Sequence, residues 1–268
     1  MKLNHIYNKS CEDMSDLDDG SIDLIVTSPP YFNLKEYSQW DTYDDYLWWI
    51  DGVILECYRV LRPGGWVCWN VQDSIPFPPR LSAGERYSEA LASDSIKMLQ
   101  SAGLFYEKSI VWYKGQGTAT QRLFGSYPRP GLLLVSGLTE HIILCRKHRG
   151  KYKRKITKDI ETKSLLTKDE WSKWTLDLWT ISPESSKRIG HPAPFPVEIP
   201  YRLIRMFSFY GDVILEPFLG SGSTALAAKK AGRNFIGYET SKKYIKIAKD
   251  RISSVVDIFG DKNDKNNF

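Results

Sequence analysis

Short apolar runs separated by polar or glycine-rich turns dominate the pattern of this chain. Ile22–Val26 is a short β-branched run with one polar interruption, which is typical of a buried strand. Asp212–Leu215 and Asn234–Tyr238 have the same character, and between them Ala225–Ala231 predicts a helix that Gly232 would cap. Because strands alternate with helices, the pattern indicates an α/β fold with a doubly wound, mostly parallel sheet. A further helix is expected to begin near Tyr43, and we assign its aromatics Trp48 and Trp49 to the core or to a subunit contact.

The segment Thr27-Ser28-Pro29-Pro30-Tyr31 directly follows the first predicted strand. Two consecutive prolines cannot continue a sheet ladder, and each holds the preceding residue in extended geometry. The strand should therefore end abruptly in a stiff loop that carries a hydroxyl, carbonyl oxygens and an aromatic ring. In open α/β sheets, ligands bind at that edge. For an isolated Pro-Pro-Tyr, however, a plain proline-rich turn is the better interpretation.

A second motif, Glu216–Thr224, decides between these interpretations. Its glycines Gly220 and Gly222 lie between a strand and a helix, an arrangement that lets the backbone approach a nucleotide-like ligand. Glu239 follows about 20 residues later at the tip of the next strand, where an acid can hold a ribose hydroxyl pair. A tight turn with a surface glutamate is the alternative. Ala225 replaces the third glycine of a dinucleotide fingerprint and no Gly-Lys-Ser/Thr follows, so we expect an adenosine without a pyrophosphate.

Together the two motifs resemble those of DNA amino-methyltransferases that use S-adenosylmethionine. Thr27–Tyr31 is similar to the catalytic [Asp/Asn/Ser]-Pro-Pro-[Tyr/Phe] motif, and Pro217–Thr224 to the Phe-x-Gly-x-Gly cofactor motif. Their order, with the catalytic motif first, is that of the β group. The resemblance covers nearly the whole chain and implies a Rossmann-like methyltransferase fold with a small inserted target-recognition region. Further segments resemble later parts of the family in the expected order: Tyr58–Gly65, Trp66–Asn70, Ile110–Lys114, Thr139–Leu144 and His191–Pro196.

The resemblance implies a role for each matching residue. Ser28 Oγ and the Pro29 carbonyl would accept hydrogen bonds from the exocyclic amine of the target base, and this frees the nitrogen lone pair for in-line attack on the sulfonium methyl. Pro30 stiffens the loop, so the acceptors are preorganised, and Tyr31 would stack on a base rotated out of the duplex. The implied cofactor contacts are Ser10, Cys11, Thr27, Ala193, Phe195, Glu216, Pro217, Phe218, Gly220, Ser221, Gly222, Ser223, Thr224, Glu239 and Thr240.

The first motif position bears on the choice of base. Serine there, as at Ser28, resembles N4-cytosine enzymes, whereas Asp or Asn is typical of N6-adenine enzymes. We therefore expect transfer to the N4 amine of a flipped-out cytosine, with N6-adenine as the alternative. Cytosine-C5 methylation needs a thiolate, and no cysteine here follows a proline in the manner of that family. A methyltransferase acting on RNA or protein, and a catalytically silent nucleic-acid binder, are the other hypotheses.

Basic residues are concentrated in one segment. Between Arg146 and Trp174 eleven Lys or Arg stand against four Asp or Glu, a surplus of seven that exceeds the net charge of +5 of all 268 residues. Such a run supplies phosphate contacts, although a solvated lysine-rich surface is the alternative. Gly115–Pro130, rich in Gly, Gln, Thr, Arg and aromatics, is a second candidate for base reading, and the sequence does not choose between them. The expected DNA contacts are Lys114, Gln116, Arg122, Arg129, Lys151, Lys153, Arg154 and Lys155.

These assignments divide the chain into a catalytic half (1–114), a recognition region (115–190) that includes one sheet strand (139–145), a cofactor half (191–260) and a polar tail (261–268) that we expect to be disordered. The four cysteines form no CxxC pair and have no metal-ligand spacing, so neither a metal nor a disulfide is expected. No apolar stretch is long enough to span a bilayer, and the polar amino terminus is unlike a signal peptide. We expect a cytoplasmic monomer or homodimer that acts on double-stranded DNA. A cognate restriction endonuclease acting separately would complete a restriction-modification system.

Overall fold

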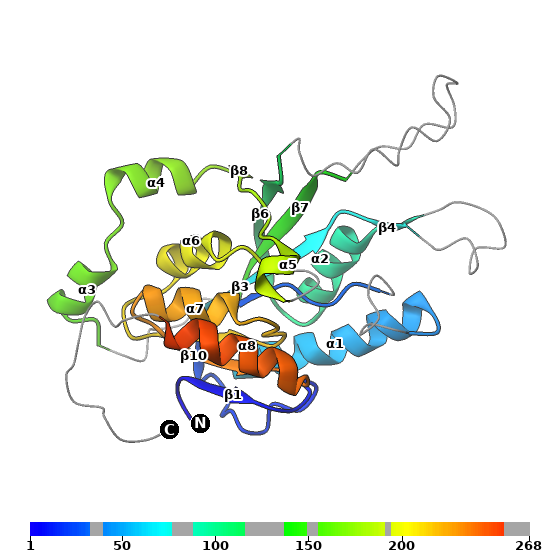
Figure 1. Cartoon of the computed structure of the whole chain (residues 1–268), viewed down its shortest axis with the longest axis horizontal. Coiled ribbons are helices and arrows are strands. Elements are labelled where there is room, and N and C mark those ends of the chain that lie inside the picture. Colours follow the sequence, from blue (N-terminus) through cyan, green and yellow to red (C-terminus); the bar gives the residue numbers. More distant parts are fainter. Residues whose placement is uncertain (33–39, 77–87, 116–136, 149–154, 191–193, 255–268) are drawn as a thin grey trace.

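An eight-stranded sheet with the strand order β1-β10-β9-β2-β3-β7-β6-β8 forms the centre of the molecule (Figure 1). The computed structural model describes residues 1–32, 40–76, 88–115, 137–148, 155–190 and 194–254, so the predicted tail 261–268 lies outside the described residues. The sheet strands are β1 (His5–Tyr7), β2 (Ile22–Thr27), β3 (Leu61–Gln72), β6 (Phe105–Tyr113), β7 (Thr139–Arg146), β8 (Leu178–Thr180), β9 (Val213–Glu216) and β10 (Asn234–Tyr238), while β4 (Ile75–Pro76) pairs with β5 (Ser88–Glu89) apart from it. The helices are α1 (Tyr43–Val60), α2 (Leu91–Ser101), α3 (Lys158–Ser164), α4 (Lys168–Trp174), α5 (Ser186–Ile189), α6 (Glu198–Phe207), α7 (Ser223–Lys230) and α8 (Lys242–Ser253).

β7 is the strand that runs against its neighbours. β1, β10, β9, β2 and β3 pair in parallel, β7 is antiparallel to both β3 and β6, and β6 pairs in parallel with β8. The predicted mostly parallel α/β sheet is therefore confirmed. The predicted strands that became β2, β9 and β10, and the predicted helix that became α7, differ from the structure by no more than two residues at either end.

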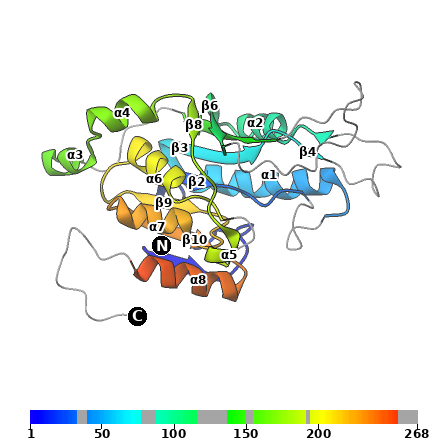
Figure 2. The ribbon, with the colours of Figure 1, turned by 45° about the horizontal axis from the view of Figure 1, so that its top comes forward.

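The side chains of β2 show why the sheet is covered on both faces. Leu24 and Val26 point into one core cluster, while Ile25 between them points into the other, because successive side chains of a strand alternate. The first face is packed by α6, α7 and α8, and the second by α1 and α2 (Figure 2). Buried on both sides, the strand has no solvated face, which explains its continuous apolar pattern.

α1 begins at a capping box and buries one side. The Thr42 hydroxyl accepts from the Asp45 amide at 3.1 Å, and the Asp45 carboxylate accepts from the Thr42 amide at 3.0 Å. Tyr46 is buried against the sheet, whereas Trp48 is 81% exposed. The assignment of Trp48 to the core is therefore wrong, because this residue lies on the face of the helix turned away from the sheet.

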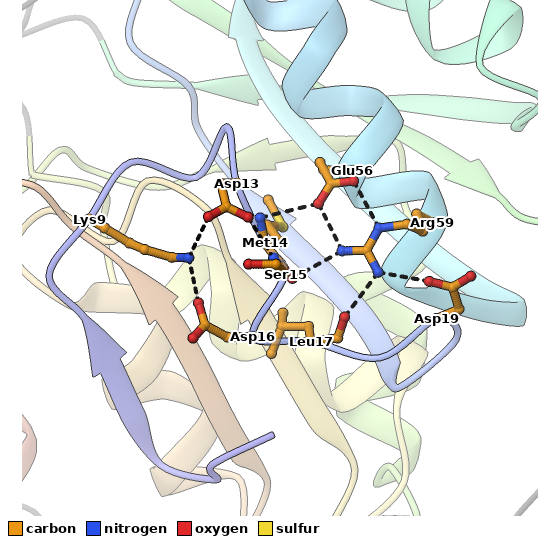
Figure 3. Close-up of polar contacts among 9 residues, drawn as sticks. All are labelled: Lys9, Asp13, Met14, Ser15, Asp16, Leu17, Asp19, Glu56 and Arg59. Carbon is orange, nitrogen blue, oxygen red and sulfur yellow. Dashed lines mark hydrogen bonds and ion pairs between the residues drawn. The ribbon is translucent and has the colours of Figure 1, made fainter.

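The amino-terminal segment 9–19 is fastened to α1 through Arg59 (Figure 3). The guanidinium donates to the Leu17 carbonyl at 2.9 Å and to the Met14 carbonyl at 3.0 Å, and Glu56 accepts from two of its nitrogens. Lys9 pairs with Asp16 at 2.6 Å and so closes the same segment on itself. Just before this segment, Asn8 Nδ2 donates to the carbonyls of Glu239 at 3.0 Å and Thr240 at 2.9 Å, beyond the carboxyl end of β10.

The direction of β7 separates the two segments predicted to contact DNA. Glu140, near the start of β7, is opposite Gln72 at the carboxyl end of β3, and Arg146 is opposite Trp66. The segment between β6 and β7 therefore leaves and returns at the carboxyl edge of the sheet, where the Lys114 amide donates to the Leu138 carbonyl at 2.9 Å. The basic run leaves β7 at the amino edge, and α3 and α4 lie on the side of the molecule opposite the start of α1 (Figure 1).

Lys147, the second residue of the basic run, binds backbone carbonyls within the fold. Its buried ammonium donates to the carbonyls of Tyr58 at 2.6 Å and Leu61 at 2.8 Å, and so caps the carboxyl end of α1. Burial lowers the pKa of this ammonium. Arg146 pairs with Glu107 at 2.5 Å. These two positive charges are therefore used within the fold.

Among the described residues, no helix is long and apolar enough to cross a membrane.

Candidate active site

A cavity of about 570 Å³ opens at the carboxyl edge of the sheet, and both sequence motifs line it. Ser28–Tyr31 enters it from the loop after β2, and Glu216–Ser221 from the loop after β9. These loops are neighbours because β2 and β9 are paired strands, although their motifs are far apart in the sequence. A volume of this size is in the range of small-molecule sites.

The structure brings most of the predicted site residues together. Those that line the cavity are Ser10, Cys11, Ser28, Pro29, Pro30, Tyr31, Lys114, Phe195, Glu216, Pro217, Phe218, Gly220, Ser221, Ser223, Thr224, Glu239 and Thr240. Thr27 is fully buried beneath it, and Lys155 is exposed and does not line it. The predictions for Ala193, Gln116, Arg122, Arg129, Lys151, Lys153 and Arg154 lie outside the described residues.

Glu216 is a buried carboxyl held by uncharged donors. Its Oε1 atom accepts from the Thr27 hydroxyl and from the Phe218 amide at 3.1 Å, and its Oε2 atom accepts from the Thr224 hydroxyl at 2.7 Å. The residue is 4% exposed, and burial raises its pKa to about 8 despite these hydrogen bonds. Thr27 and Thr224 therefore hold the Glu216 carboxyl in place by hydrogen bonds. This carboxyl forms part of the cavity wall.

Glu239 and the glycine loop are joined directly. The Glu239 carboxylate accepts from the Gly220 amide at 2.9 Å and from the Ser241 amide at 2.7 Å, and burial raises its pKa. A carboxylate has more acceptor positions than these two bonds use, so it can also receive hydroxyl donors from a ligand.

Close packing against α8, and not contact with the cavity, explains why residue 222 is a glycine. It has a φ of +80°, and a Cβ atom there would lie 2.7 Å from the Cβ atom of Ala248 in α8. A side chain at this position would therefore push α8 away from the start of α7. Gly222 is absent from the cavity lining, so the structure offers packing, and not ligand contact, as the reason for this glycine.

The opposite wall is organised around Glu140, a buried acid that the sequence interpretation missed. Glu140 is 7% exposed and accepts from the Tyr31 hydroxyl at 3.1 Å and from Asn70 Nδ2. Its Oε1 atom forms an ion pair with Lys114 Nζ at 2.5 Å. Burial and the charge of Glu140 hold the pKa of Tyr31 well above its usual range.

Asn70 connects this acid to Ser28. Its Nδ2 atom also donates to Ser28 Oγ at 3.3 Å, while its Oδ1 atom is buried without a partner in the described part of the chain. The amide orientation follows from Glu140, because a carboxylate accepts but cannot donate. Two features of the sequence could have pointed to this pair. Asn70 is a polar residue near the end of an apolar strand, and Glu140 is an acid at the start of another.

Trp49 also belongs to this cavity. It lies on α1, lines the cavity beside Trp40, and its ring centroid is 5.7 Å from that of Phe218. Trp49 is partly buried and packs against the core, as predicted, and it lines the cavity as well. Trp112 lies further along the wall, with the Lys114 ammonium 5.2 Å from its ring centroid.

A mostly parallel sheet with one reversed strand, a glycine loop joined to an acid on the next strand, and a rigid Ser-Pro-Pro-Tyr loop define a methyltransferase of the amino-directed class. The chain belongs to the DNA methylase family of N6 and N4 methyltransferases, whose model matches residues 22–250. It is a β-group DNA amino-methyltransferase that uses S-adenosylmethionine.

Individual relatives agree with this assignment. The Type II methyltransferase M.MthZI of Methanothermobacter thermautotrophicus is 31% identical, over 96% of this chain and 78% of that protein. TTHA0409 of Thermus thermophilus, solved as a complex with S-adenosyl-L-methionine, matches with a TM-score of 0.77 at 29% identity and covers 93% of both chains. The cytosine-N4-specific PvuII DNA methyltransferase matches with a TM-score of 0.71 over 98% of this chain and 88% of its own, and at 20% identity it supports the fold alone.

The residues of the cavity fit this cofactor. The free acceptor positions of Glu239 suit the two ribose hydroxyls, and the aromatic and apolar surfaces beside it suit an adenine ring. Glu216, the second acid in the wall, would complement the positive charge of a sulfonium or an ammonium group once it ionises.

Proposed function

We propose that this protein methylates the N4 amine of a cytosine at a specific site in double-stranded DNA. The observation that carries the choice of base is Ser28, which has a hydroxyl where N6-adenine enzymes typically have Asp or Asn. A second candidate is N6-adenine methylation by the same mechanism, because a hydroxyl can accept from either amine.

The proposed mechanism assigns separate tasks to the residues of the motif. Ser28 Oγ and the Pro29 carbonyl accept from the two N–H groups of the target amine and draw its lone pair out of conjugation with the ring. The prolines hold these acceptors in place before the base arrives, so no ordering is needed during reaction. Tyr31 stacks on the flipped base. S-adenosylmethionine supplies an electrophilic methyl group when it is bound.

The cofactor wall has a matching set of proposed tasks. Glu239 would hold the ribose, the backbone of Gly220 and Ser221 would contact the cofactor, and Glu216 would meet its positive charge, since all four residues line the cavity. Ser10 and Cys11 line the cavity too and would contribute contacts to the adenine end. Phe195 adds an aromatic surface to the same cavity.

We further propose that the segment between β6 and β7 reads the DNA sequence. It is anchored at the carboxyl edge of the sheet, beside Lys114 and the cavity, whereas the basic run leaves β7 at the other edge. In this proposal the basic run of Lys151, Lys153, Arg154 and Lys155 contributes general attraction to phosphate rather than base contacts. The boundaries 1–114, 115–190 and 191–260 remain the proposed functional division.

The similarity to M.MthZI, a Type II methyltransferase, supports a restriction-modification setting with a separate endonuclease. A screen of plasmid DNA recovered from cells that express the protein, against a panel of restriction enzymes, would identify the protected site. Protection at no site would count against this setting.

The choice of base is tested by mass spectrometry of nucleosides. DNA from an expressing host that lacks its own methyltransferases is digested and compared with DNA from cells that express Ser28→Ala. N4-methylcytosine present only in the wild-type sample is the expected result. N6-methyladenine instead would overturn the cytosine assignment. If neither product is found in DNA and added methyl groups are found on RNA or protein, DNA would be overturned as the substrate.

A further inference from the structure

Lys114 carries hydrogen-bond donors that the fold leaves for a ligand. It directly follows β6, lines the cavity, and pairs with Glu140 at 2.5 Å. An ammonium group has three N–H donors, and within the described part of the chain this carboxylate is its one acceptor. Lys9, the other basic residue described in the cavity wall, pairs with both Asp13 at 3.0 Å and Asp16 at 2.6 Å. Lys114 is therefore the cation of this wall with donors to spare.

The Lys114 side chain is also held in one direction. Its amide donates to the Leu138 carbonyl at 2.9 Å, where β6 and β7 come together. Its ammonium lies 5.2 Å from the ring centroid of Trp112, and its side chain is 19% exposed. Glu140, which is buried, holds the same ammonium from β7. A donor that is fixed before its ligand arrives loses little conformational freedom on binding.

The polar groups of this wall follow one another in a fixed order. Asn70 Nδ2 donates to Ser28 Oγ at 3.3 Å and also to Glu140 Oε2, and Glu140 Oε1 faces Lys114 Nζ. The Tyr31 hydroxyl donates to Glu140 Oε2 at 3.1 Å. The two Nδ2 protons of Asn70 and the Tyr31 proton are therefore directed at groups of the wall itself. Lys114 comes last in this order, beyond Asn70 and Glu140 as seen from Ser28, and it is the member that keeps donors for a ligand.

A flipped cytosine presents its polar groups in a matching order. Along the Watson–Crick edge, the amine is followed by the ring nitrogen N3 and then by the O2 carbonyl. Enzymes that act on a flipped base read this edge by hydrogen bonds. With the amine at Ser28 and the ring on Tyr31, the far end of the edge carries a carbonyl acceptor, for which a charged N–H donor is a strong partner. Adenine has a C–H group in the place of O2, and a site built to hydrogen-bond a substrate group discriminates against a base that lacks it.

We propose that the Lys114 ammonium donates to the O2 carbonyl of the flipped cytosine and so selects cytosine over adenine. Glu140 is the positioning residue that holds the ammonium in place. The inference rests on the proposed N4 methylation, and it adds to Ser28 a second determinant of the target base. It also accounts for the buried carboxylate on β7, since an apolar side chain of similar volume would pack there at lower cost.

The first test compares Lys114→Met with wild type in single-turnover methyl transfer, at saturating cofactor, to a duplex that carries the site found in the protection screen. Methionine keeps an unbranched side chain but has no N–H donor. The rate should fall at least about tenfold, the size expected when a hydrogen bond from a charged group is lost. Lys108→Met is the matched control, because Lys108 lies on β6, pairs with Asp177 at 2.7 Å, is 62% exposed and does not line the cavity. Its rate should stay within about twofold of wild type.

The second test removes the acceptor from the base. In a modified duplex, the target cytosine is replaced by the C-nucleoside of 2-aminopyridine, which keeps the amine and the adjoining ring nitrogen but has a C–H group in place of the O2 carbonyl. The base ratio, defined as the cytosine rate divided by the analogue rate, should be at least about tenfold higher in wild type than in Lys114→Met, because only the wild type loses a contact. Differences in reactivity and pairing between the two bases are common to both proteins and cancel in this comparison. A duplex with adenine at the target position should change the ratio in the same direction.

Two further variants separate base contact from a structural role. Lys114→Met leaves the Glu140 carboxylate without its ammonium, which should lower stability. Combining it with Glu140→Gln removes the uncompensated charge, so thermal stability should recover while the rate and the base ratio do not. Gln72 also lines the cavity and has an amide that can donate, which makes it the competing candidate. In this proposal, Gln72→Ala keeps the base ratio of the wild type.

The role of Lys114 would be overturned by a wild-type base ratio in Lys114→Met, by recovery of the rate in the double variant, or by a base ratio that depends on Gln72 instead. These outcomes are separate from failure of the proposed function. If DNA treated with wild-type protein yields no N4-methylcytosine, the cytosine assignment fails and the role of Lys114 fails with it. If N4-methylcytosine is present and the base ratio does not depend on Lys114, only the role of Lys114 fails.

Discussion

The two edges of the central sheet treat charged side chains in different ways. At the amino edge, positive charges find partners within the fold: Arg62 pairs with Asp23 at 2.8 Å, and Lys147 caps α1. At the carboxyl edge, Glu216 is buried with uncharged donors only, and the acceptor capacity of Glu239 is partly unused. Arg62 and Lys147 are satisfied by partners within the fold and contribute to stability, whereas the carboxyl groups of Glu216 and Glu239, which have no basic partner, mark a ligand site. The number of basic residues in a segment is therefore a weaker guide to function than the way in which they are paired.

Substitutions in the Ser-Pro-Pro-Tyr loop, at the carboxyl edge, should reduce the rate of methyl transfer more than any substitution at the amino edge. Combining Ser28→Ala with Tyr31→Ala removes one acceptor and the stacking ring, and we expect methyl transfer to fall at least about 100-fold. Tritium transfer from labelled cofactor to plasmid DNA measures it, with Glu107→Gln at the amino edge as the control. A rate within threefold of wild type would refute the mechanism.

The second comparison concerns the two segments predicted to contact DNA. Arg122→Ala with Arg129→Ala should weaken DNA binding about tenfold or more at about 0.1 M salt, and should also change site preference. Removing the charges of Lys151, Lys153, Arg154 and Lys155 should lower affinity equally for specific and non-specific DNA and flatten the salt dependence. Fluorescence anisotropy with both kinds of duplex measures these effects. An unchanged salt slope in the second variant would assign that run to solvated surface.

A smaller effect, on the pH dependence of cofactor affinity, should come from Glu216, whose pKa is raised to about 8 by burial. The free protein holds this carboxyl mostly neutral at pH 6.5, and a cationic cofactor favours the ionised form. Cofactor affinity should therefore rise about tenfold from pH 6.5 to 8, with release of a proton on binding. Isothermal titration calorimetry in buffers of different ionisation enthalpy measures both quantities. Glu216→Gln should bind more weakly and lose this extra pH dependence.

The same carboxyl gives a stability prediction of opposite sign. Its pKa is higher in the folded protein than its ordinary value of 4.5, so the native state binds the proton more tightly than the unfolded chain. Its contribution to stability is therefore present at low pH and is lost as the pH rises towards 8. Thermal unfolding of Glu216→Gln should show a flatter decline of Tm between pH 5 and 8 than wild type.

Substitutions on the surface of α3 and α4 should have the smallest effect on stability and none on methylation. Lys163 pairs with Asp159, and Lys173 with Asp169, both at 2.9 Å and both between residues one helical turn apart on the surface. Replacing both lysines by alanine should shift Tm by less than about 2 °C and leave methylation unchanged. Circular dichroism checks the first outcome. A loss of methylation would show that this side of the molecule takes part in DNA binding.

The parts of the site that lie in one stretch of chain could be predicted. Ser28–Tyr31 is stiff because proline fixes the backbone, and the loop around Gly220 is tight because glycine reaches a positive φ of 51° there. These properties are local, so they are readable from neighbouring residues. Glu140 and Asn70 could not be found in the same way, because they meet only through the pairing of β7 with β3.

The sequence by itself determined β2, β9, α7 and β10 in their order, the two loops with their stiff or permissive backbones, and the acids at the ends of β9 and β10. Each of these depends on apolar periodicity or on the backbone restrictions of proline and glycine, which act within a few residues. Only the tertiary structure decided that β7 runs antiparallel, which places Glu140 behind Tyr31 and sends the basic run to the other edge of the sheet. Strand direction and register depend on packing between distant segments, and no single stretch of the chain contains that information.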